Sequence, residues 1–396
     1  MNMVGEIVKL TEVKLKDVII SANTGADAIQ RAPIVDYNTG IKCLRIGDIS
    51  NKRKYNDWGY TNVNENNYKR YKLRKGNIII ARTGSTVGIN KYIERDYNSV
   101  YNNGLIRLVI DETKYNSRFI YYIIQMKEFR NYINGIAFGT TGQPNIQIND
   151  LLNFRFSDIT LEKQNKIVNI LENIDKKIEL NNQINDNLHN IGLIFYKKWI
   201  NCLVDNNETT YKKIKELGKI VMGQSPKGES YNNDNIGLPL INGASDYENG
   251  YLKAQKYTSM PTKTCNKNDL IFCIRATIGL LTICDQKYCL GRGVASITDI
   301  DDNYKEYAYY LINNSIEEFK KLATGSVIVG INKDDIGNIK VKLPTDKQIE
   351  SFHNLQKPIF EKINNIRLEN KNLVNIRDAL LPKLMNGEIE LDKVDI

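Results

Sequence analysis

The chain of 396 residues carries 55 basic and 46 acidic residues, a net charge of +9, and 41% of its residues are hydrophobic. This length suits two or three domains, and this composition excludes a chain that is disordered throughout. No stretch approaches the ~18 consecutive apolar residues of a membrane helix, and the N-terminus lacks the apolar core of a signal peptide. We therefore expect a cytoplasmic protein with no membrane partner.

The positive charge is concentrated in the first half of the chain. Residues 1–200 hold 29 basic and 20 acidic side chains, whereas the remainder holds 26 of each. A basic surface suits a polyanionic partner such as nucleic acid. If both halves bind nucleic acid, the second half must do so through a local patch.

Residues 10–158 alternate short runs of β-branched and aromatic residues with turns rich in Gly, Asn and Asp. Gly104–Ile110 and Leu152–Phe156 read as strands, and Phe119–Phe129 reads as a helix. These elements predict a segment of mixed α/β or α+β structure, and they leave the order of its strands open.

A long helix is predicted from Leu161 to Ile200, because apolar residues recur there at the spacing of a coiled-coil seam. Asn181 lies within this seam, where a buried Asn would help to fix the helix register. The polar joint at 201–210 reads as a loop. The seam positions are Ile167, Ile170, Ile174, Ile184, Leu188, Ile191 and Phe195.

The second half repeats this plan. Residues 211–344 contain predicted strands at Gly293–Ile297 and Ile339–Leu343 and a predicted helix at Lys305–Leu322. A second long helix begins at Thr345. An offset of 185 residues brings seven apolar positions of the first helix onto apolar positions of the second: Ile167, Ile170, Ile174, Ile178, Leu188, Ile191 and Phe195. Such agreement indicates an internal repeat of a globular segment followed by a long helix.

Each long helix, at about 40 residues, would extend roughly 60 Å. Pro358 lies inside the second helix, where a proline removes a main-chain donor, so we expect a kink or a short break near residue 357. The counterpart of Asn181 in the second helix is Ile366, which is apolar.

Sequence signatures of catalysis are missing. The chain has no Pro-Pro dipeptide, which the catalytic loop of a DNA methyltransferase would need, and no GxGxxG fingerprint. Gly223–Ser230 has the outline of a P-loop, but Glu229 stands where the phosphate-binding lysine must be. Two histidines, His189 and His353, and six cysteines without a CxxC argue against a His triad or a zinc site. We predict no catalytic residue and no metal site.

Candidate nucleic-acid contacts are easier to find. The stretch 42–75 is dense in Lys and Arg, among them Arg45 and the run 52–54, and aromatic residues lie between them. Such groups neutralise phosphates and pack on sugars or bases, although a charged run can also be a solvated face.

Arginine and amide side chains follow several predicted strands. Arg82 and Arg275 occupy matching strand ends beside Thr83 and Thr277, where each could contact guanine or phosphate or form a structural salt bridge. Gln143 and Asn145 follow the Gly-Thr-Thr-Gly loop at 139–142, where amides could read adenine or hold a turn. Arg292 lies between two glycines and leaves the same two readings open.

Several short sequence motifs resemble those of a known family. Val221–Pro226 followed by Leu238–Asp246, together with Leu343–Pro344 and Leu380–Ile389, resembles the specificity subunits of Type I restriction–modification systems. The resemblance covers nearly the whole chain. The first half departs from it, because it lacks the Gly-Gln-Ser-Pro phrase, and this weakens transfer of residue roles to that half.

The resemblance implies an α+β fold in which two pseudo-repeated globular α/β target-recognition domains are joined by two long antiparallel coiled-coil helices. The expected boundaries are 1–158 for the first recognition domain and 159–200 for the first spacer helix. The second recognition domain is expected at 201–344, and the second spacer helix with a C-terminal tail at 345–396.

The resemblance also implies a function without catalysis in this chain. Each recognition domain reads one half of a bipartite, asymmetric site in double-stranded DNA, and the helices set the gap. The helices also dock two adenine methyltransferase subunits, which bring S-adenosylmethionine, and restriction subunits, where they exist, bring ATP and Mg. This chain itself needs no cofactor. The candidate DNA contacts are Arg45, Lys52, Arg53, Lys54, Arg82, Thr83, Gln143, Asn145, Gln224, Lys227, Asn242, Arg275, Thr277 and Arg292.

Two other classes of function remain open. One is a coiled-coil scaffold without a DNA role, against which the basic first half and the globular repeats argue. The other is a self-contained, type II-like restriction or methylation enzyme, against which the missing catalytic signatures argue. Measuring how the affinity for DNA depends on salt would distinguish a DNA-binding protein from a coiled-coil scaffold, because phosphate contacts weaken as salt rises.

Overall fold

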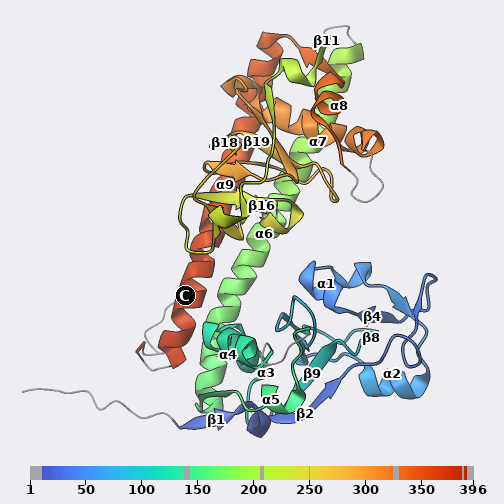
Figure 1. The fold of residues 1–396 in the computed structure, drawn as a ribbon, viewed down its shortest axis with the longest axis vertical. Helices are drawn as coiled ribbons and strands as arrows, with labels where there is room; N and C mark the ends of the chain where they lie inside the picture. Colours follow the sequence, from blue (N-terminus) through green and yellow to red (C-terminus); the bar gives the residue numbers. More distant parts are fainter. Residues whose placement is uncertain are drawn as a thin grey trace, which may run out of the picture. The chain divides into compact units, whose positions relative to one another are not determined.

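A computed structural model describes residues 11–137, 143–205, 209–248, 250–323, 330–385 and 388–389. The predicted loop at 139–142 and most of the predicted C-terminal tail lie outside these residues. The chain divides into two compact units, of which unit 1 comprises Met1–Ile178 and Lys371–Ile396 and unit 2 comprises Glu179–Asn370. Each unit therefore combines one globular segment with a stretch of both long helices (Figure 1). The domain boundaries predicted from the sequence, at residues 158, 200 and 344, stay a prediction.

Unit 1 contains two four-stranded sheets. The first has the order β2-β9-β6-β7, all antiparallel, and the second has the order β3-β5-β4-β8, in which β4 and β8 are parallel. The strands are β2 (Ile19–Thr24), β3 (Ile34–Val35), β4 (Lys42–Leu44), β5 (Tyr60–Thr61), β6 (Ile78–Ala81), β7 (Asn90–Tyr92), β8 (Ser99–Tyr101) and β9 (Leu105–Ile110). The predicted strand at 104–110 is confirmed as β9.

Strand β6 is buried on both faces, which explains its uninterrupted apolar sequence. Ile78 and Ile80 belong to the core beneath the helices, whereas Ile79 and Ala81 belong to the core between the sheets. Successive residues of a strand point to opposite faces, so a strand between two cores needs apolar residues at every position.

The helices of unit 1 differ from the prediction in one respect. The expected helix at 119–129 is two helices, α3 (Ser117–Gln125) and α4 (Lys127–Ala137), because Met126 is extended between them. Asn116 caps α3 by accepting from two main-chain N–H groups. The remaining elements are α1 (Ile46–Ser50), α2 (Glu65–Tyr71), α5 (Ile148–Leu151) and the pair β1 (Glu12–Lys14) with β10 (Arg155–Ser157).

Unit 2 repeats the plan of unit 1. One sheet has the order β12-β22-β19-β20, a second has the order β13-β17-β14-β21-β18 with β14 and β21 parallel, and α7 covers the first. The strands are β11 (Thr209–Lys213), β12 (Lys219–Met222), β13 (Tyr231–Asn232), β14 (Leu238–Ile241), β15 (Tyr247–Glu248), β16 (Tyr251–Leu252), β17 (Lys256–Thr258), β18 (Thr264–Cys265), β19 (Leu270–Cys273), β20 (Leu281–Ile283), β21 (Tyr288–Leu290), β22 (Val294–Thr298) and β23 (Lys340–Pro344). The helices are α7 (Lys305–Leu322) and α8 (Lys333–Asn338). The predicted helix at 305–322 and strands at 293–297 and 339–343 are therefore confirmed to within a residue.

The two long helices are α6 (Leu161–Asp205) and α9 (Asp346–Met385). In unit 1, Asp175 of α6 contacts Arg377 of α9 at 2.9 Å. In unit 2, Asn181 donates to Asn370 at 2.8 Å, and the rings of Phe195 and Phe352 lie 6.0 Å apart. In unit 2, rising numbers on α6 meet falling numbers on α9, so the helices pair antiparallel, as predicted. Helix α6 continues through residues 201–205, where a loop was expected.

Helix α9 runs without interruption through Pro358, so the expected short break is wrong. A proline removes one helical hydrogen bond. Pro358 itself is exposed, whereas Phe352, Gln356 and Ile363 on either side of it are buried. The packing of these neighbours holds the helix on both sides of the missing bond.

The predicted coiled-coil seam is confirmed only at its start. Ile167, Ile170 and Ile174 are buried in unit 1, but Ile184 and Ile191 are 44% and 55% exposed. In unit 2, α6 instead buries another face, formed by Asn181, Asn185, Gly192 and Tyr196. This face packs on α9 and on the aromatic residues of α7. Within the described part of the chain, every helix is too short or too polar to span a membrane.

Candidate nucleic-acid interface

Three main-chain segments of unit 1 converge on the tight turn between β8 and β9. We call residues 101–105 in unit 1, and their equivalents 290–294 in unit 2, the central turn. The turn closes by a hydrogen bond from Leu105 N to Asn102 O at 3.1 Å. The converging segments are joined to it by the bonds Ala26 N to Tyr101 O (2.9 Å), Asn102 N to Leu44 O (3.0 Å), Gly25 N to Leu105 O (3.1 Å) and Arg82 N to Gly104 O (2.9 Å).

The central turn of unit 2 has the same set of main-chain bonds. It closes from Val294 N to Gly291 O at 3.3 Å. The corresponding bonds are Gln224 N to Leu290 O (2.8 Å), Gly291 N to Ile241 O (2.8 Å), Gly223 N to Val294 O (3.0 Å) and Ile274 N to Gly293 O (2.9 Å). The two units therefore build one backbone scaffold twice, and the equivalences between them follow from these bonds.

Glycines allow the segments to approach so closely. A Cβ atom on Gly25 would lie 2.3 Å from the main-chain oxygens of Tyr101 and Asn102. A Cβ atom on Gly223, its equivalent, would lie 2.0 Å from Gly291 O. Main chain packs directly on main chain at both places, so a side chain would have to displace backbone.

The structure brings five predicted contact residues of unit 1 to this scaffold. Arg82 Nε donates to Asn145 Oδ1 at 3.3 Å, and Thr83 forms a β-bridge with Asn145. The Gln143 amide lies 3.6 Å from the Cβ position of Gly84. Arg45 follows directly after Leu44, and its buried Nε has no hydrogen-bond partner among the described residues.

Three predicted contact residues of unit 1 lie further out. Lys52, Arg53 and Lys54 are exposed and follow the end of α1. Arg53 pairs with the buried carboxylate of Asp48 at 3.3 Å. These residues form a charged rim rather than part of the hydrogen-bonded scaffold.

Part of the basic and aromatic stretch at 42–75 is structural. Lys42 is buried, and its Nζ donates to Asn56 O at 2.7 Å and to Trp58 O at 2.9 Å. Trp58 and Tyr71 belong to the core between the sheets, so the expectation that they face nucleic acid is wrong. The sequence signal mixed core residues with surface ones, because both types alternate along short strands.

In unit 2, Gln224, Asn242, Arg275 and Arg292 are brought to the equivalent scaffold. Arg292 Nε donates to Ser225 Oγ at 3.0 Å. Asn242 N donates to the carboxylate of Asp246 at 2.7 Å, as Arg45 N does to Asp48 at 2.9 Å. Arg275 forms a β-bridge with Gly330. The other two predicted contact residues, Lys227 and Thr277, are exposed on adjoining segments.

The expected match between Arg82 and Arg275 is wrong by one residue. Arg82 N and Ile274 N make equivalent bonds to the central turn, and Ile146 N and Ile331 N bond to the carbonyl groups of Arg82 and Ile274. Arg275 is therefore the equivalent of Thr83. Neighbouring residues of an extended chain point to opposite sides, so this shift decides which side chain reaches which surface.

Burial controls the ionisation of several groups near these scaffolds. Burial raises the pKa of the Asp246 carboxyl, although hydrogen bonds from Asn242, Gln255 and Gly243 main-chain N–H groups oppose it. Burial also raises the pKa of the Cys43 thiol to about 12, so this thiol is protonated and a poor nucleophile. Within the described ranges, no cluster of three His, Cys, Asp or Glu side chains is placed to hold a metal ion.

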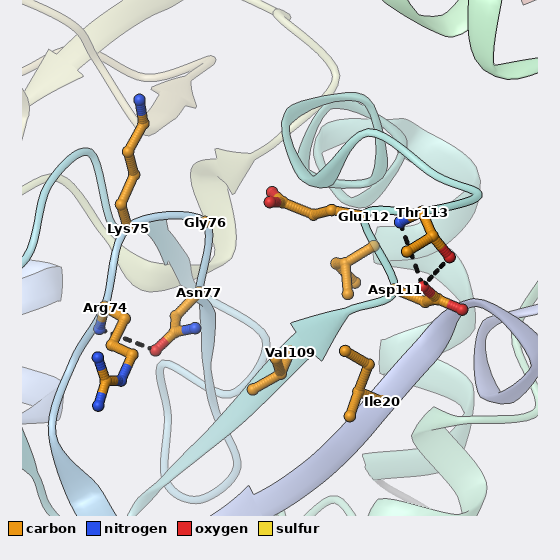
Figure 2. Close-up of a pocket in the computed structure, with 10 residues that line it drawn as sticks. Ile20, Arg74, Lys75, Gly76, Asn77, Val109, Asp111, Glu112 and Thr113 are labelled. Carbon is orange, nitrogen blue, oxygen red and sulfur yellow. Dashed lines mark hydrogen bonds between the residues drawn. The ribbon is translucent and has the colours of Figure 1, made fainter.

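A shallow hollow of unit 1 lies away from the scaffold. Figure 2 shows Lys75 and Glu112 on opposite sides of this hollow, with Arg74 and Asp111 below them. Its lining comes from the residues just before β6, from the last residues of β9 and those that follow, and from the start of β2, whereas the central turn lies at the opposite ends of β6 and β9. Opposing charges line it, and it contains none of the predicted DNA contacts.

Sequence reasoning missed one residue of the scaffold. Asn103 lies in the central turn of unit 1 and is exposed, and its equivalent in unit 2 is Arg292. The Asn-Asn-Gly sequence between two apolar strands is a turn signal that could have found it.

Comparisons with known proteins agree with a repeated recognition domain. The family model described as the type I restriction modification DNA specificity domain matches twice, at residues 8–190 and 206–377. The type I restriction enzyme MjaIX specificity subunit of Methanocaldococcus jannaschii is 26% identical, with 99% of this chain and 96% of that protein covered. The HindI specificity subunit of Haemophilus influenzae is 22% identical, with 89% and 96% covered.

A solved structure shares the fold. The S subunit of a type I restriction–modification system from M. genitalium aligns with a TM-score of 0.51 at 16% identity, over 97% of this chain and 98% of that one. Together with the two family matches, which span most of the sequence, this places the chain in the family of type I restriction–modification DNA specificity subunits, which are non-catalytic recognition subunits.

Proposed function

We propose that each unit reads one half of a bipartite, asymmetric site in double-stranded DNA. The observation that carries this proposal is one backbone scaffold built twice with different side chains. Arg45 in unit 1 corresponds to Asn242 in unit 2, and Thr83 corresponds to Arg275. Guanidinium groups suit guanine and amides suit adenine, so such scaffolds suit two different half-sites.

The charged rim of unit 1 supplies contacts of another kind. Lys52, Arg53 and Lys54 are exposed beside the scaffold, where they can neutralise phosphates without reading bases. Their replacement by Ala should weaken binding to every duplex alike and flatten its dependence on salt.

The long helices set the gap between the half-sites. Helix α6 has 45 residues, which at ~1.5 Å per residue extends roughly 68 Å, more than the ~34 Å of one duplex turn. The buried pair Asn181 and Asn370 opposes sliding of the helices, because a slip would leave two amides without partners.

An exposed apolar face of α6 is the proposed docking site for a methyltransferase subunit. Leu180, Ile184, Ile191 and Phe195 are all exposed on the part of α6 that belongs to unit 2. Residues at such spacing form a stripe that a partner helix would cover. Because the chain is a two-fold repeat, we propose two methyltransferase subunits, which carry S-adenosylmethionine. Restriction subunits, where they exist, carry ATP and Mg, and the complex works in the cytoplasm.

The test is to express the chain with its methyltransferase partner and to map N6-methyladenine across the host DNA by single-molecule sequencing. A bipartite motif that requires this chain is the expected result. An assembled complex that yields no motif would overturn the proposal and favour the alternative function, that of a coiled-coil scaffold protein without a DNA role. The variant Ile184→Glu/Ile191→Glu should abolish methylation and co-purification while leaving the helical content unchanged.

The spacing function has its own test. Insertion of seven residues into α6 should change the preferred gap and leave both half-site sequences unchanged. Altered half-sites with an unchanged gap would show that the helices do not set the spacing.

A further inference from the structure

The middle residue of the central turn stands out in both units. It is Asn103 in unit 1 and Arg292 in unit 2, and both side chains are exposed although the residues on either side of them make main-chain hydrogen bonds to other segments. Asn103 N donates to Ala26 O at 2.9 Å, and the residues before and after it bond to two further segments, at Leu44 and Arg82. The main chain at this position is therefore held in place by hydrogen bonds, while the side chain is exposed to solvent.

Rigidity and exposure together are what a reading position requires. A side chain that recognises a base must be held close to its productive geometry by ordered surroundings, and sites on rigid elements meet this need best. The central turn is the point at which four segments are joined by main-chain hydrogen bonds. A Cβ atom on Gly291 or Gly293, on either side of Arg292, would lie 2.1 or 2.0 Å from an oxygen of Asn242, so close packing also fixes the turn.

The side chains have the donors and acceptors that base reading needs. Arg292 Nε is occupied by Ser225 Oγ at 3.0 Å, which orients the guanidinium plane. Its two terminal nitrogens have no partner among the described residues, and neither has the amide of Asn103. A guanidinium matches the O6 and N7 acceptors of guanine, whereas an Asn amide matches N6 and N7 of adenine.

We propose that this turn position reads one base pair in each half-site, with Asn103 reading adenine and Arg292 reading guanine. The proposal rests on the proposed function and assigns a specificity-determining role to Asn103. It also explains why two scaffolds with the same main-chain bonds differ at this position: the side chain there can change without disturbing any of those bonds.

The test exchanges the two side chains in the full chain, as Asn103→Arg and Arg292→Asn, each expressed with the methyltransferase partner. Asn103→Arg should change one base pair of one half-site in the methylation map, with the other half-site and the gap unchanged. Arg292→Asn should do the same in the other half-site. The preference for the original base should fall by about 5- to 100-fold, the range expected for one bidentate contact.

Asn66→Arg is the matched control, because Asn66 is an exposed Asn of the same unit, on α2, and gains the same charge. This control should leave the motif unchanged, which separates base reading from added charge. Dissociation constants are measured in parallel for the wild-type duplex and for duplexes with single base-pair changes. This readout covers a variant that binds DNA but supports too little methylation to map.

Two results would overturn the inference. One is an unchanged motif in both exchange variants with full methylation. The other is an equal loss of affinity for all duplexes, which would indicate a phosphate contact or a structural role. A wild-type complex that gives no motif would instead defeat the proposed function itself, so the two failures are distinguishable.

Discussion

The junction between the globular segment and the long helices contains a shared carboxylate in unit 1 and a cluster of aromatic rings in unit 2; we call them the ionic and the aromatic junction. In unit 1, Asp175 of α6 accepts from Tyr122 Oη at 2.7 Å and pairs with Arg377 of α9 at 2.9 Å. In unit 2, the corresponding place holds a cluster of stacked and edge-on rings. Its members are Tyr196, Trp199, Tyr307, Tyr309, Tyr310, Phe352 and Phe360.

This difference shows how two units can share a backbone and differ in chemistry. The sheet orders and the bonds of the central turn are repeated, because main-chain groups make them and almost any side chain is compatible with them. The junctions are made by side chains, so each unit can form its junction from different residue types. The same freedom at the central turn is what would let two half-sites differ.

Removal of the carboxylate at the ionic junction should have the largest effect on stability. Asp175→Ala leaves the Tyr122 hydroxyl and the Arg377 guanidinium without their shared acceptor, and should lower the free energy of unfolding of unit 1 by about 3 kcal/mol. Urea denaturation measures this change. Asp378→Ala is the control, since Asp378 binds the same arginine at 2.8 Å but is 63% exposed, and should cost less than about 1 kcal/mol. Equal losses would show that the junction is not the source.

The aromatic junction should be sensitive to volume instead of charge. A Cβ atom on Gly192 would lie 1.7 Å from Tyr310 Oη, so Gly192→Ala should lower the stability of unit 2 by about 2 kcal/mol. Gly135→Ala is the control, because a Cβ atom there meets nothing within 4 Å in helix α4 and should stabilise by up to about 1 kcal/mol. Thermal unfolding of both variants compares them. A neutral Gly192→Ala would mean that Tyr310 moves aside freely.

Equivalent positions of the two scaffolds should affect different half-sites. Arg275→Ala should weaken or relax the reading of one half-site by about 1–3 kcal/mol if the arginine contacts a base. Thr83→Ala, at the equivalent place in unit 1, should affect the other half-site and less strongly, because a hydroxyl makes one bond where a guanidinium makes two. Binding to duplexes altered in one half-site measures both. Equal loss at both half-sites would contradict the assignment of one unit to each.

The smallest effect concerns pH. Burial against Tyr309 lowers the pKa of His189 below its ordinary 6.5, although Asp186 opposes this. As the pH is lowered from about 6.5 to the lowered pKa of the folded state, the unfolded chain binds a proton at His189 that the folded chain does not, so the free energy of unfolding should decrease as the pH decreases through that range. Above about pH 7 the residue contributes no slope. His189→Phe should remove this part of the slope, and a slope equal to that of wild type would show that His189 does not titrate differently on folding.

Local pattern was enough to predict many elements. The strands at 104–110 and 293–297, the helix at 305–322 and the two long helices follow from periodicity and from flanking turn residues, which act over a few residues. The repeat itself also followed from sequence, because matching apolar positions recur at one offset.

The face of α6 that is buried could not be predicted, although the helix could. Two apolar or small faces compete along residues 181–196, and the aromatic residues of α7, more than 100 residues away, decide between them. The same holds for Pro358, which buried neighbours keep within a continuous helix.

The sequence by itself determined the family, the repeated plan and the presence of basic and amide side chains near strand ends. Only the tertiary structure decided which of them meet: that Arg82 corresponds to Ile274, that Thr83 corresponds to Arg275, and that Asn103 lies where Arg292 does. The reason is physical. Periodicity reflects contacts within one element, whereas the central turn is built from hydrogen bonds between segments tens of residues apart. A shift of one residue in the pairing of such segments leaves the local sequence pattern unchanged, but it exchanges the side chains that are exposed.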